Sequence, residues 1–372
     1  MTRSKHIVCI CILFCFAAVK LHASFSLHSV ENLRSHLSNN AILCMHQDQY
    51  GFMWFGTYDG LNLYNGKNVD TFRFEFDNPN SLSGNSIYSI TNAEDSYLWI
   101  GTQLGLDKFS LKERIVVESF PEYKKNETIA CDTQGNAWLI SKENSLSYYS
   151  IKHKIFTNIP DQGRNVQNVR EIYVNQSGVL CIIKSDGLIK MLEVTEKENT
   201  GAGIEYELHW REKRLHEKGI YKAYYKDDTI FFVDDEMVLY TYDTHKQQKM
   251  LIKNISKLIF NYGNLSDIVF FHSDVYLAFT HSGMIKLDLS KQYAPEAINI
   301  DNGIFCILKD KNQDALWVGT DGQGIELYYS EKDKFYSIML ENLPFVAKKP
   351  IRTFYTDEEN TLWYGTDRKS VV

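Results

Sequence analysis

One short segment of this sequence has side chains of the kinds that bind a metal ion. Asp310, Asn312 and Asp314 have the alternate spacing of a calcium-binding loop. Such a loop needs a glycine after its third ligand and a glutamate to close it. Ala315 takes the glycine position, and no glutamate follows at the expected distance. The 11 histidines and 7 cysteines form no His-x-x-x-His or Cys-x-x-Cys pair. We therefore predict no metal site and no cofactor.

Motifs for catalysis are also missing from the sequence. It contains no Gly-x-Ser-x-Gly nucleophile motif and no phosphate-binding loop. We therefore predict no catalytic residue, and we predict that this chain is not an enzyme.

Three residues are candidates for contact with a ligand. Tyr58 and Asp59 stand at a polar turn, where both side chains would be exposed. Trp210 could offer a ring face to the apolar side of a pyranose. The residues around Trp210 alternate between charged and apolar, however, which is also typical of a half-buried strand. Trp210 thus has a packing interpretation beside the ligand-binding one.

A repeated pentapeptide must position these residues. The pattern Leu/Met-Trp-x-Gly-Thr begins at residues 53, 98, 316 and 362, and a worn copy begins at residue 137. Five of the 6 tryptophans stand in this register: Trp54, Trp99, Trp138, Trp317 and Trp363. A large residue that recurs at a fixed period indicates stacked copies of one unit. We predict that these tryptophans are core residues.

The frame of the repeat continues where the tryptophan is absent. We predict that Cys181, Phe231 and Leu277 take its place in the middle of the chain. Each copy has an apolar run, a polar turn, the tryptophan strand, a glycine, a second strand and a short last strand. Four short strands in roughly 40–50 residues are typical of a β-propeller blade. Eight copies can be recognised, and the eighth is cut off.

These copies predict an all-β fold. We expect a seven-bladed β-propeller with four-stranded blades over residues 24–345, and the first strands of a second propeller over residues 346–366. Residues 25–30 should supply a strand that closes the ring, but the sequence does not say which blade receives it. Residues 335–338 should form the last strand of the seventh copy.

The two ends of the chain differ from the repeat. Residues 1–23 have a basic start and an apolar run over residues 7–19, which predicts a secretory signal peptide and a periplasmic location. The run is short for a membrane span. Residues 367–372 leave the repeat, so we interpret them as a sequence artefact and the chain as truncated.

The charge of the chain indicates which partners to expect, and the positions of its cysteines indicate whether disulfides form. Without the signal peptide, 37 of the 40 basic residues remain against 47 acidic ones, so nucleic acid is not an expected partner. Cys44, Cys131, Cys181 and Cys306 lie in different copies. We expect them to be buried thiols without disulfides.

Residues 47–67 and 80–87 carry more than a generic blade. They read QDQYGFMWFGTYDGLNLYNGK and NSLSGNSI. Together they resemble the start of the periplasmic N-terminal sensor region of hybrid two-component regulators, which combine a histidine kinase with a response regulator. The resemblance covers residues 25–366 and is strongest in copies one, two, seven and eight.

This resemblance implies a sensor that recognises oligosaccharides and controls glycan-utilisation genes. It implies a missing C-terminal part with the membrane helix, the kinase and the DNA-binding domain, and a homodimer in the full-length receptor. Two alternatives remain open. One is an exported propeller enzyme that cleaves glycans, a glycosidase or lyase with carboxylates gathered in a central funnel. The other is an interaction propeller without a small ligand.

Overall fold

The structure is a computed structural model. It describes residues 25–29, 35–94, 96–124, 128–140, 145–160, 166–197, 205–272, 274–288, 291–298, 300–330, 351–356, 362–366 and 369–371. Residues Phe25–Ser330 form one compact unit. The signal peptide predicted at residues 1–23 and the strand predicted at residues 335–338 lie outside the described residues.

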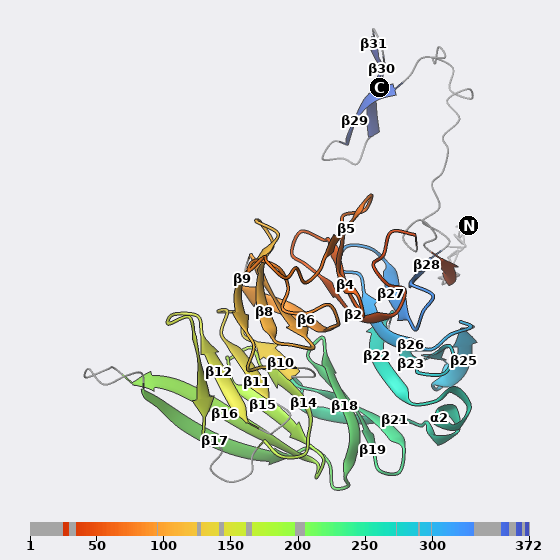
Figure 1. The fold of residues 1–372 in the computed structure, drawn as a ribbon. Helices are drawn as coiled ribbons and strands as arrows, with labels where there is room; N and C mark the ends of the chain where they lie inside the picture. The colour runs from red at the N-terminus through yellow and green to blue at the C-terminus, as the bar shows by residue number, and fades with distance from the viewer. Residues whose placement is uncertain are drawn as a thin grey trace, which may run out of the picture. The chain divides into compact units, whose positions relative to one another are not determined.

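Seven four-stranded antiparallel sheets follow one another around a ring in the compact unit (Figure 1). Blade 1 contains β2 (Ile42–Gln47), β3 (Met53–Thr57), β4 (Gly60–Tyr64) and β5 (Val69–Phe72). Blade 2 contains β6 (Ile87–Glu94), β7 (Tyr97–Thr102), β8 (Leu106–Ser110) and β9 (Ile115–Phe120). Blade 3 contains β10 (Thr128–Cys131), β11 (Ala137–Ile140), β12 (Leu146–Ser150) and β13 (Ile155–Ile159).

The middle blades have the same order. Blade 4 contains β14 (Val169–Val174), β15 (Leu180–Lys184), β16 (Leu188–Lys197) and β17 (Glu205–Arg214). Blade 5 contains β18 (Ile220–Lys226), β19 (Thr229–Asp234), β20 (Val238–Asp243) and β21 (Gln248–Asn254), and a short helix, α2 (Ser256–Tyr262), follows it. Blade 6 contains β22 (Leu265–Phe271), β23 (Asp274–Phe279), β24 (Met284–Asp288) and β25 (Ala294–Ile298).

The seventh blade is built from both ends of the compact unit. Its strands β26 (Ile304–Lys309), β27 (Ala315–Thr320) and β28 (Ile325–Ser330) are completed by β1 (Phe25–Ser29), which pairs antiparallel with β28. The N-terminal strand thus closes the ring on blade 7, which the sequence left undecided. The backbone oxygen of Asn40 strengthens this closure by accepting hydrogen bonds from the amides of Gly322 and Gly324.

The first strand of each blade lies innermost, against the first strands of the two neighbouring blades, and β26 contacts β2. The ring is therefore continuous, and the predicted seven-bladed β-propeller with four-stranded blades is confirmed. Closure leaves each sheet packed between two others, so one propeller can bury its apolar residues over more than 300 residues.

The tryptophans of the repeat are core residues, as predicted. Trp54, Trp99, Trp138 and Trp317 are all at most 6% exposed. In two blades an aspartate of the preceding turn fixes the indole, since Trp54 Nε1 donates to Asp48 at 2.9 Å and Trp317 Nε1 donates to Asp310 at 2.8 Å. Burying a ring of this size contributes strongly to stability, and the aspartate satisfies its polar edge.

The glycine of the repeat is needed for close packing between blades. A Cβ at Gly56 would lie 2.4 Å from the sulfur of Cys44 and 2.8 Å from Ile87 of the next blade. The threonine that follows closes the turn, because Thr57 Oγ1 donates to the backbone oxygen of Gly60 at 2.9 Å. Each residue of the pentapeptide thus has a packing or hydrogen-bonding role.

Strand pairing corrects one prediction about the middle copies. Six inner strands share a one-residue register shift opposite the glycine position, between Ile42/Cys44, Ile87/Ser89, Val169/Glu171, Ile220/Lys222, Leu265/Asp267 and Ile304/Cys306. Counting from this shift confirms Cys181 and Phe231 as equivalents of the tryptophan. The prediction of Leu277 is wrong by one residue, because Tyr276 takes that position. Ala278 and Phe279 replace the Gly-Thr pair there, so the sequence offered no anchor.

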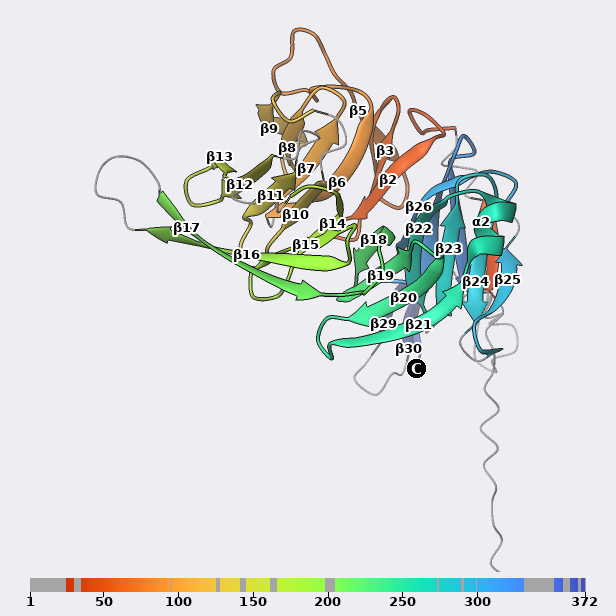
Figure 2. The ribbon, with the colours of Figure 1, turned by 90° about the horizontal axis from the view of Figure 1, so that it is seen from below.

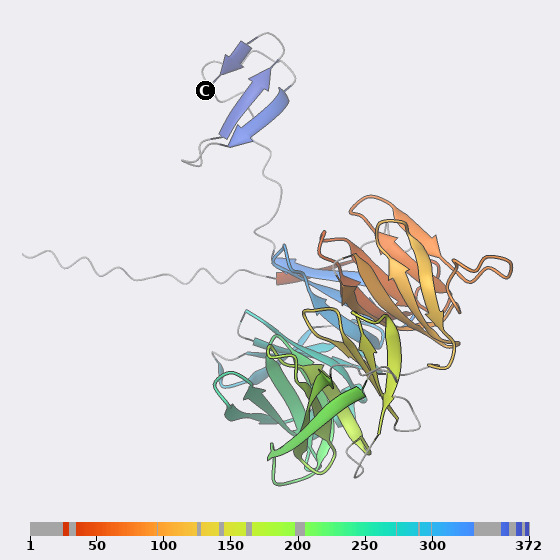
Figure 3. The same ribbon diagram turned by 90° about the vertical axis from the view of Figure 1, so that its left-hand side faces the viewer.

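A separate three-stranded sheet contains β29 (Ile351–Thr356), β30 (Leu362–Thr366) and β31 (Lys369–Val371) (Figure 3). Its first two strands repeat the pairing of the propeller blades, including the register shift. Residues 369–371, which the sequence analysis left out of the fold, pair with β30.

The four cysteines of the described residues are free thiols in inner or second strands. Cys44 and Cys306 take the same place in two blades, and each sulfur donates to a backbone oxygen of the next blade, that of Ile87 or Ile42. Burial raises the pKa of the Cys44 thiol to about 12. These thiols therefore act as small packing groups.

Candidate ligand-binding site

The antiparallel order of the blades divides the turns of the propeller between two faces. The turns that join first to second strands and third to fourth strands lie on one face, which we call the A face. The turns that join second to third strands, and the connections between blades, lie on the opposite B face. Turns from several blades converge on each face near the inner strands, where ligand sites of propellers can form.

The larger hollow of the A face lies over blades 1, 2 and 3, and we call it the first hollow. Its volume is about 650 Å³, within the range of small-molecule sites. Its lining residues are Gln49, Thr91, Asn92, Ala93, Ser96, Tyr97, Leu111, Cys131, Asp132, Thr133, Gln134 and Gly135. Hydroxyl and amide groups dominate this lining, with one aromatic ring and one carboxylate.

Several polar groups of the first hollow are available for a ligand. The side-chain hydroxyls of Thr91, Ser96 and Thr133 make no hydrogen bond within the described part of the chain. The carboxylate of Asp132 is occupied, since it accepts from the amides of Gln134 and Asn136 at 2.9 and 2.8 Å. Among the described side chains, the hollow thus offers neutral donors and acceptors rather than a free charge.

A buried cation holds the aromatic wall of this hollow. Lys108 is 5% exposed, and its ammonium group lies 4.8 Å from the ring centroid of Tyr97. The same ammonium donates to the hydroxyl of Tyr149 at 3.2 Å. A desolvated cation over an aromatic ring is worth about 1–2 kcal/mol, which favours a fixed orientation of Tyr97.

A histidine from blade 1 orients one amide of the lining. His46 Nε2 lies 2.8 Å from Oδ1 of Asn92. Burial lowers the pKa of His46 to about 4, against which the hydrogen bond with Asn92 acts. His46 is therefore neutral at physiological pH, and as a donor through Nε2 it leaves the Asn92 amino group for other partners.

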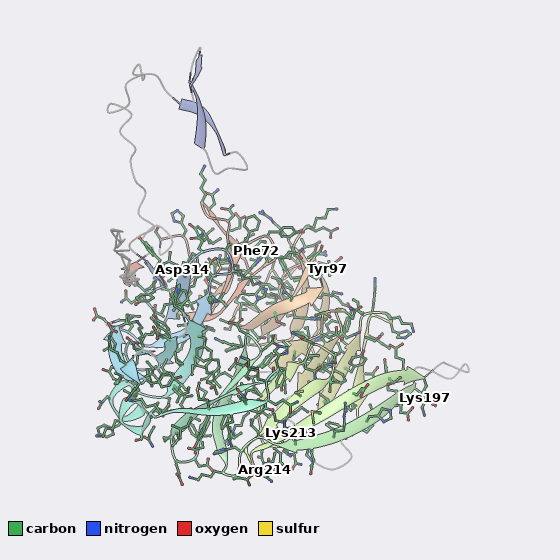
Figure 4. The ribbon with its side chains drawn as sticks, turned by 180° about the vertical axis from the view of Figure 1, so that it is seen from behind. Phe72, Tyr97, Lys197, Lys213, Arg214 and Asp314 are labelled. Carbon is green, nitrogen blue, oxygen red and sulfur yellow. The ribbon has the colours of Figure 1, made fainter. Side chains whose placement is uncertain are left out.

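A second hollow lies on the same face over blades 4 and 5, with a volume of about 260 Å³. Its lining residues are Tyr173, Asn175, Gln176, Ser177, Cys181, Ile189, Met191, Lys213, Tyr225, Asp228, Tyr242, Thr244, His245 and Gln247. Tyr173 and Tyr225 stack at 3.9 Å between centroids, with 15° between their planes. Figure 4 labels Tyr97 of the first hollow and Lys213 of the second hollow, which belong to different blades.

Several polar groups of the second hollow bind one another. Asp228 accepts from Tyr225 Oη at 2.7 Å and pairs with His245 at 3.0 Å. Lys213 donates to Tyr242 Oη at 2.7 Å and to Gln247 at 2.9 Å. The hydrogen bond from His245 and the one from Tyr225 lower the pKa of Asp228. Most of this lining is a satisfied network, so a ligand would have to break existing bonds there, whereas the hydroxyl of Ser177 makes no hydrogen bond within the described residues.

The predicted ligand residues Tyr58 and Asp59 lie on the B face, away from both hollows. Tyr58 is 48% exposed. Asp59 pairs with Arg73 at 3.0 Å, with both side chains exposed. Among the described residues they line neither hollow, and their role in binding stays a prediction.

Trp210 lies in another blade, on the outermost strand of blade 4. Its side chain is half-buried, and the residues of β17 around it alternate between exposed and half-buried, as the packing interpretation predicts. The indole packs against the cluster that contains Trp138, Ile172 and Leu192. Its Nε1 is buried and finds no hydrogen-bond acceptor within the described residues. The structure does not bring Trp210 near Tyr58 or Asp59, and its ligand role also stays a prediction.

The stretch with calcium-like spacing is a turn that supports a tryptophan. One oxygen of Asp310 accepts from Trp317 Nε1, and the other accepts from the amides of Asn312 and Gln313 at 2.8 and 2.9 Å. Within the described part of the chain, no group of three His, Cys, Asp or Glu side chains is arranged to hold a metal ion.

Sequence reasoning missed the residues of the first hollow. The turns of blades 1, 2 and 3 that line it are far apart in sequence. Thr, Ser, Asn and Gln stand at these turns, but Asn175, Gln176 and Ser177 of the second hollow give the same signal.

Two segments of the chain match a known repeat family. A model of the two component regulator propeller matches residues 36–59 and 81–103, which confirms the resemblance predicted from the sequence at the level of the repeat. None of the curated proteins matches with significance. No helix within the described residues is long and apolar enough to span a membrane.

Solved structures share the fold. The chain superposes on the extracellular domain of BT3049 from B. thetaiotaomicron, a protein assigned as a hybrid two component system, with a TM-score of 0.59 and 19% identity, covering 94% of this chain and 49% of that one. The extracellular domain of BT4673, assigned likewise, gives 0.56 and 16%, covering 92% and 44%. This chain thus spans about half the length of both.

A further solved structure shares the fold at low sequence identity. The β-propeller domain of Cps50 (Swd1) from Myceliophteria thermophila gives a TM-score of 0.58 at 10% identity, covering 78% of this chain and 97% of that one. The propeller fold by itself therefore does not distinguish between functions.

Proposed function

We propose that this chain, whose seven-bladed ring carries two component regulator propeller repeats, is the ligand-recognition module of an exported two-component sensor. The observation that carries the proposal is the match of the repeats at residues 36–59 and 81–103. The fold shared with the extracellular domains of BT3049 and BT4673 supports it. This module would lie in the periplasm, and a C-terminal part of the receptor would anchor it in the inner membrane and connect it to a kinase.

We further propose that the first hollow binds an oligosaccharide and that the receptor controls glycan-utilisation genes. A sugar presents many hydroxyl groups, and the hollow offers unoccupied hydroxyls at Thr91, Ser96 and Thr133 beside the ring of Tyr97. Because Asp132 is already saturated by backbone and amide donors, a neutral glycan suits the lining better than a charged one.

Binding can be transmitted only if the ligand has unequal affinity for two states of the receptor. The first hollow spans turns of three blades, so a ligand that touches all three would favour one relative arrangement of those blades. The proposed homodimer of the full-length receptor would then carry this preference to the paired kinases.

Calorimetric titration of the full chain with a panel of neutral oligosaccharides tests this function. We expect one binding event that Ser96→Ala weakens and Ser177→Ala leaves unchanged. These two serines form a matched pair, because each lines one of the two hollows on the same face. Loss of affinity in the Ser177→Ala variant alone would contradict the assignment of the site. Cleavage of the titrated glycan would favour an exported glycosidase or lyase, and absence of any binding would favour an interaction propeller.

A further inference from the structure

The outermost strands of the blades differ in how well they resist pairing with another chain. An exposed sheet edge carries unpaired backbone groups, and proteins protect such edges by short strands, charged side chains, bulges or proline. The strands β5, β13 and β1 are 4, 5 and 5 residues long. The pairing of β9 and of β21 contains a register shift, and β25 contains Pro295.

β17 is protected by charge alone, since its side chains include three glutamates, two arginines and one lysine. It is 10 residues long and pairs with β16 without a register shift over its whole length. The hairpin of β16 and β17 reaches outward beyond the other strands of the ring, as Figures 1 and 2 show. Figure 4 labels Lys197 at the outer end of β16 and Arg214 at the inner end of β17.

The hairpin is held firmly in place by blade 3. Glu196 on β16 accepts hydrogen bonds from Lys152 at 2.9 Å and from Ser150 at 3.0 Å. The ring of Tyr206 packs edge-on against Tyr148 at 5.5 Å between centroids. A long, regular edge is therefore presented on a fixed support, which lowers the entropic cost of adding a further strand.

The charged side chains on the exposed face of β17 are divided between its two ends, with acidic residues at one end and basic residues at the other. On the exposed face, Glu205 and Glu207 come first, His209 is central, and Arg211 and Lys213 come last. When two such strands pair antiparallel around a two-fold axis through His209, Glu207 lies opposite Arg211 and Glu205 lies opposite Lys213. Leu208 then lies opposite Trp210 on the other face. Opposite charges on directly facing residues stabilise a strand pair, whereas like charges destabilise it.

We propose that β17 is a self-complementary interface that joins two copies of this chain, edge to edge, into an eight-stranded sheet across a two-fold axis at His209. The partner is a second copy because an isologous contact needs one strand that complements itself in reverse, and the two charge halves of β17 satisfy this need. The same charges disfavour parallel pairing, where Glu would face Glu and Arg would face Arg. This inference is independent of the ligand in the first hollow.

The existing ion pair on the hairpin would become part of a longer row. Arg211 already lies 3.2 Å from Glu193 on β16. In the paired state Arg211 would stand between Glu193 of its own chain and Glu207 of the partner copy. Such a row of alternating charges is worth more than an isolated exposed pair and is weakened by salt.

Sedimentation equilibrium of the full chain over a range of concentrations tests the interface. We expect a monomer–dimer equilibrium that shifts toward monomer at high salt. Glu207→Arg alone and Arg211→Glu alone should each lower the association constant by tenfold or more, because each places like charges opposite one another. The double variant Glu207→Arg/Arg211→Glu should recover most of the association, since it exchanges the two charges.

The matched control is Glu296→Arg, an exposed glutamate on the edge strand β25 that contains Pro295. It should leave the association constant unchanged. A chain that stays monomeric at all concentrations, a dimer that Glu207→Arg does not weaken, or a double variant no better than the single ones would overturn the proposal. Circular dichroism of each variant verifies that the fold is retained.

A cross-link gives a second, independent readout. His209→Cys places a thiol beside the two-fold axis, where directly opposite Cβ atoms are about 5 Å apart. Mild oxidation should give a covalent dimer in this variant. No covalent dimer in His209→Cys, or an equal yield in the control Glu296→Cys, would contradict the predicted register.

Discussion

The two hollows on the A face are built from the same turns of the same repeat, yet they differ in what their polar groups do. In the first hollow, the hydroxyls of Thr91, Ser96 and Thr133 have no partner among the described residues. In the second hollow, Asp228, His245 and the hydroxyl of Tyr225 bind one another.

This difference indicates a division of roles within one ring. A satisfied polar network contributes to stability and resists a ligand that would break it. Unoccupied polar groups beside an aromatic wall add nothing to folding but can bind a ligand. We therefore expect substitutions in the second hollow to change stability, and substitutions in the first hollow to change affinity.

The largest effect is expected from the stacked ring pair of the second hollow. Tyr173→Ala removes a side chain that is 6% exposed and leaves a cavity beside Tyr225, so the free energy of unfolding should fall by about 3–4 kcal/mol. Urea denaturation measures this loss. Glycan affinity of the folded variant should stay within a factor of two. A large loss of affinity would contradict the inference that the second hollow contributes to stability rather than to binding.

A half-buried carboxyl group of blade 4 should make stability depend on pH. Burial raises the pKa of Glu171 on β14 to about 7 from the ordinary value of 4.5. The folded chain therefore binds this proton more tightly than the unfolded chain. The stability that this confers is full below pH 4.5 and is lost as the pH rises through 7.

Glu171→Gln should remove this pH dependence. The difference in unfolding free energy between variant and parent should grow from pH 4.5 to 8 by at most roughly 3 kcal/mol. Denaturation at a series of pH values measures it, with the exposed Glu205→Gln as control. Parallel profiles for Glu171→Gln and the parent would show that Glu171 is solvated in the native state.

In the first hollow, the triple variant Thr91→Ala/Ser96→Ala/Thr133→Ala should bind its glycan about tenfold to a hundredfold more weakly, because each lost hydrogen bond is worth about 0.5–1.5 kcal/mol. Its unfolding free energy should change by less than roughly 0.5 kcal/mol. Calorimetry measures the change in affinity, and urea denaturation measures the change in unfolding free energy. A clear destabilisation would mean that these hydroxyls have partners in the native chain.

The smallest effect is expected at the exposed rim of the second hollow. His245→Ala breaks the ion pair with Asp228, whose side chains are 53% and 40% exposed, so stability should fall by about 0.5 kcal/mol or less. The pKa of Asp228 should rise toward its ordinary value. Carbon NMR of the carboxyl group follows this pKa, and an unchanged value would show that Tyr225 alone holds the carboxylate.

The architecture followed from the sequence because one residue type marks four of the seven blades. Trp54, Trp99, Trp138 and Trp317 gave the register wherever the tryptophan was kept. In blade 6 the tryptophan, glycine and threonine positions hold Tyr276, Ala278 and Phe279, and the prediction slipped to Leu277. A strand pattern of period two does not by itself fix which residue opposes which, and pairing with the inner strand supplied this information.

The candidate site could not be predicted in the same way. Its residues come from the turns of three consecutive blades, so only the packing of these blades side by side brings Gln49, Thr91 and Thr133 to one hollow. Exposed residues of a single turn, such as Tyr58 and Asp59, were easier to notice in sequence, but these lie on the opposite face. The two hollows differ in whether their polar groups have hydrogen-bond partners. Most of those partners come from other parts of the chain, and sequence spacing does not reveal them.

Hydrogen–deuterium exchange of the full chain, with and without a bound oligosaccharide, tests the central claim most directly. Binding at the first hollow should slow exchange at the turns over residues 91–97 and 132–135. Exchange at residues 175–177 and 244–247 of the second hollow should stay as it was. Protection confined to the second hollow, or to the turn with Tyr58 and Asp59, would contradict the assignment of the first hollow as the ligand site.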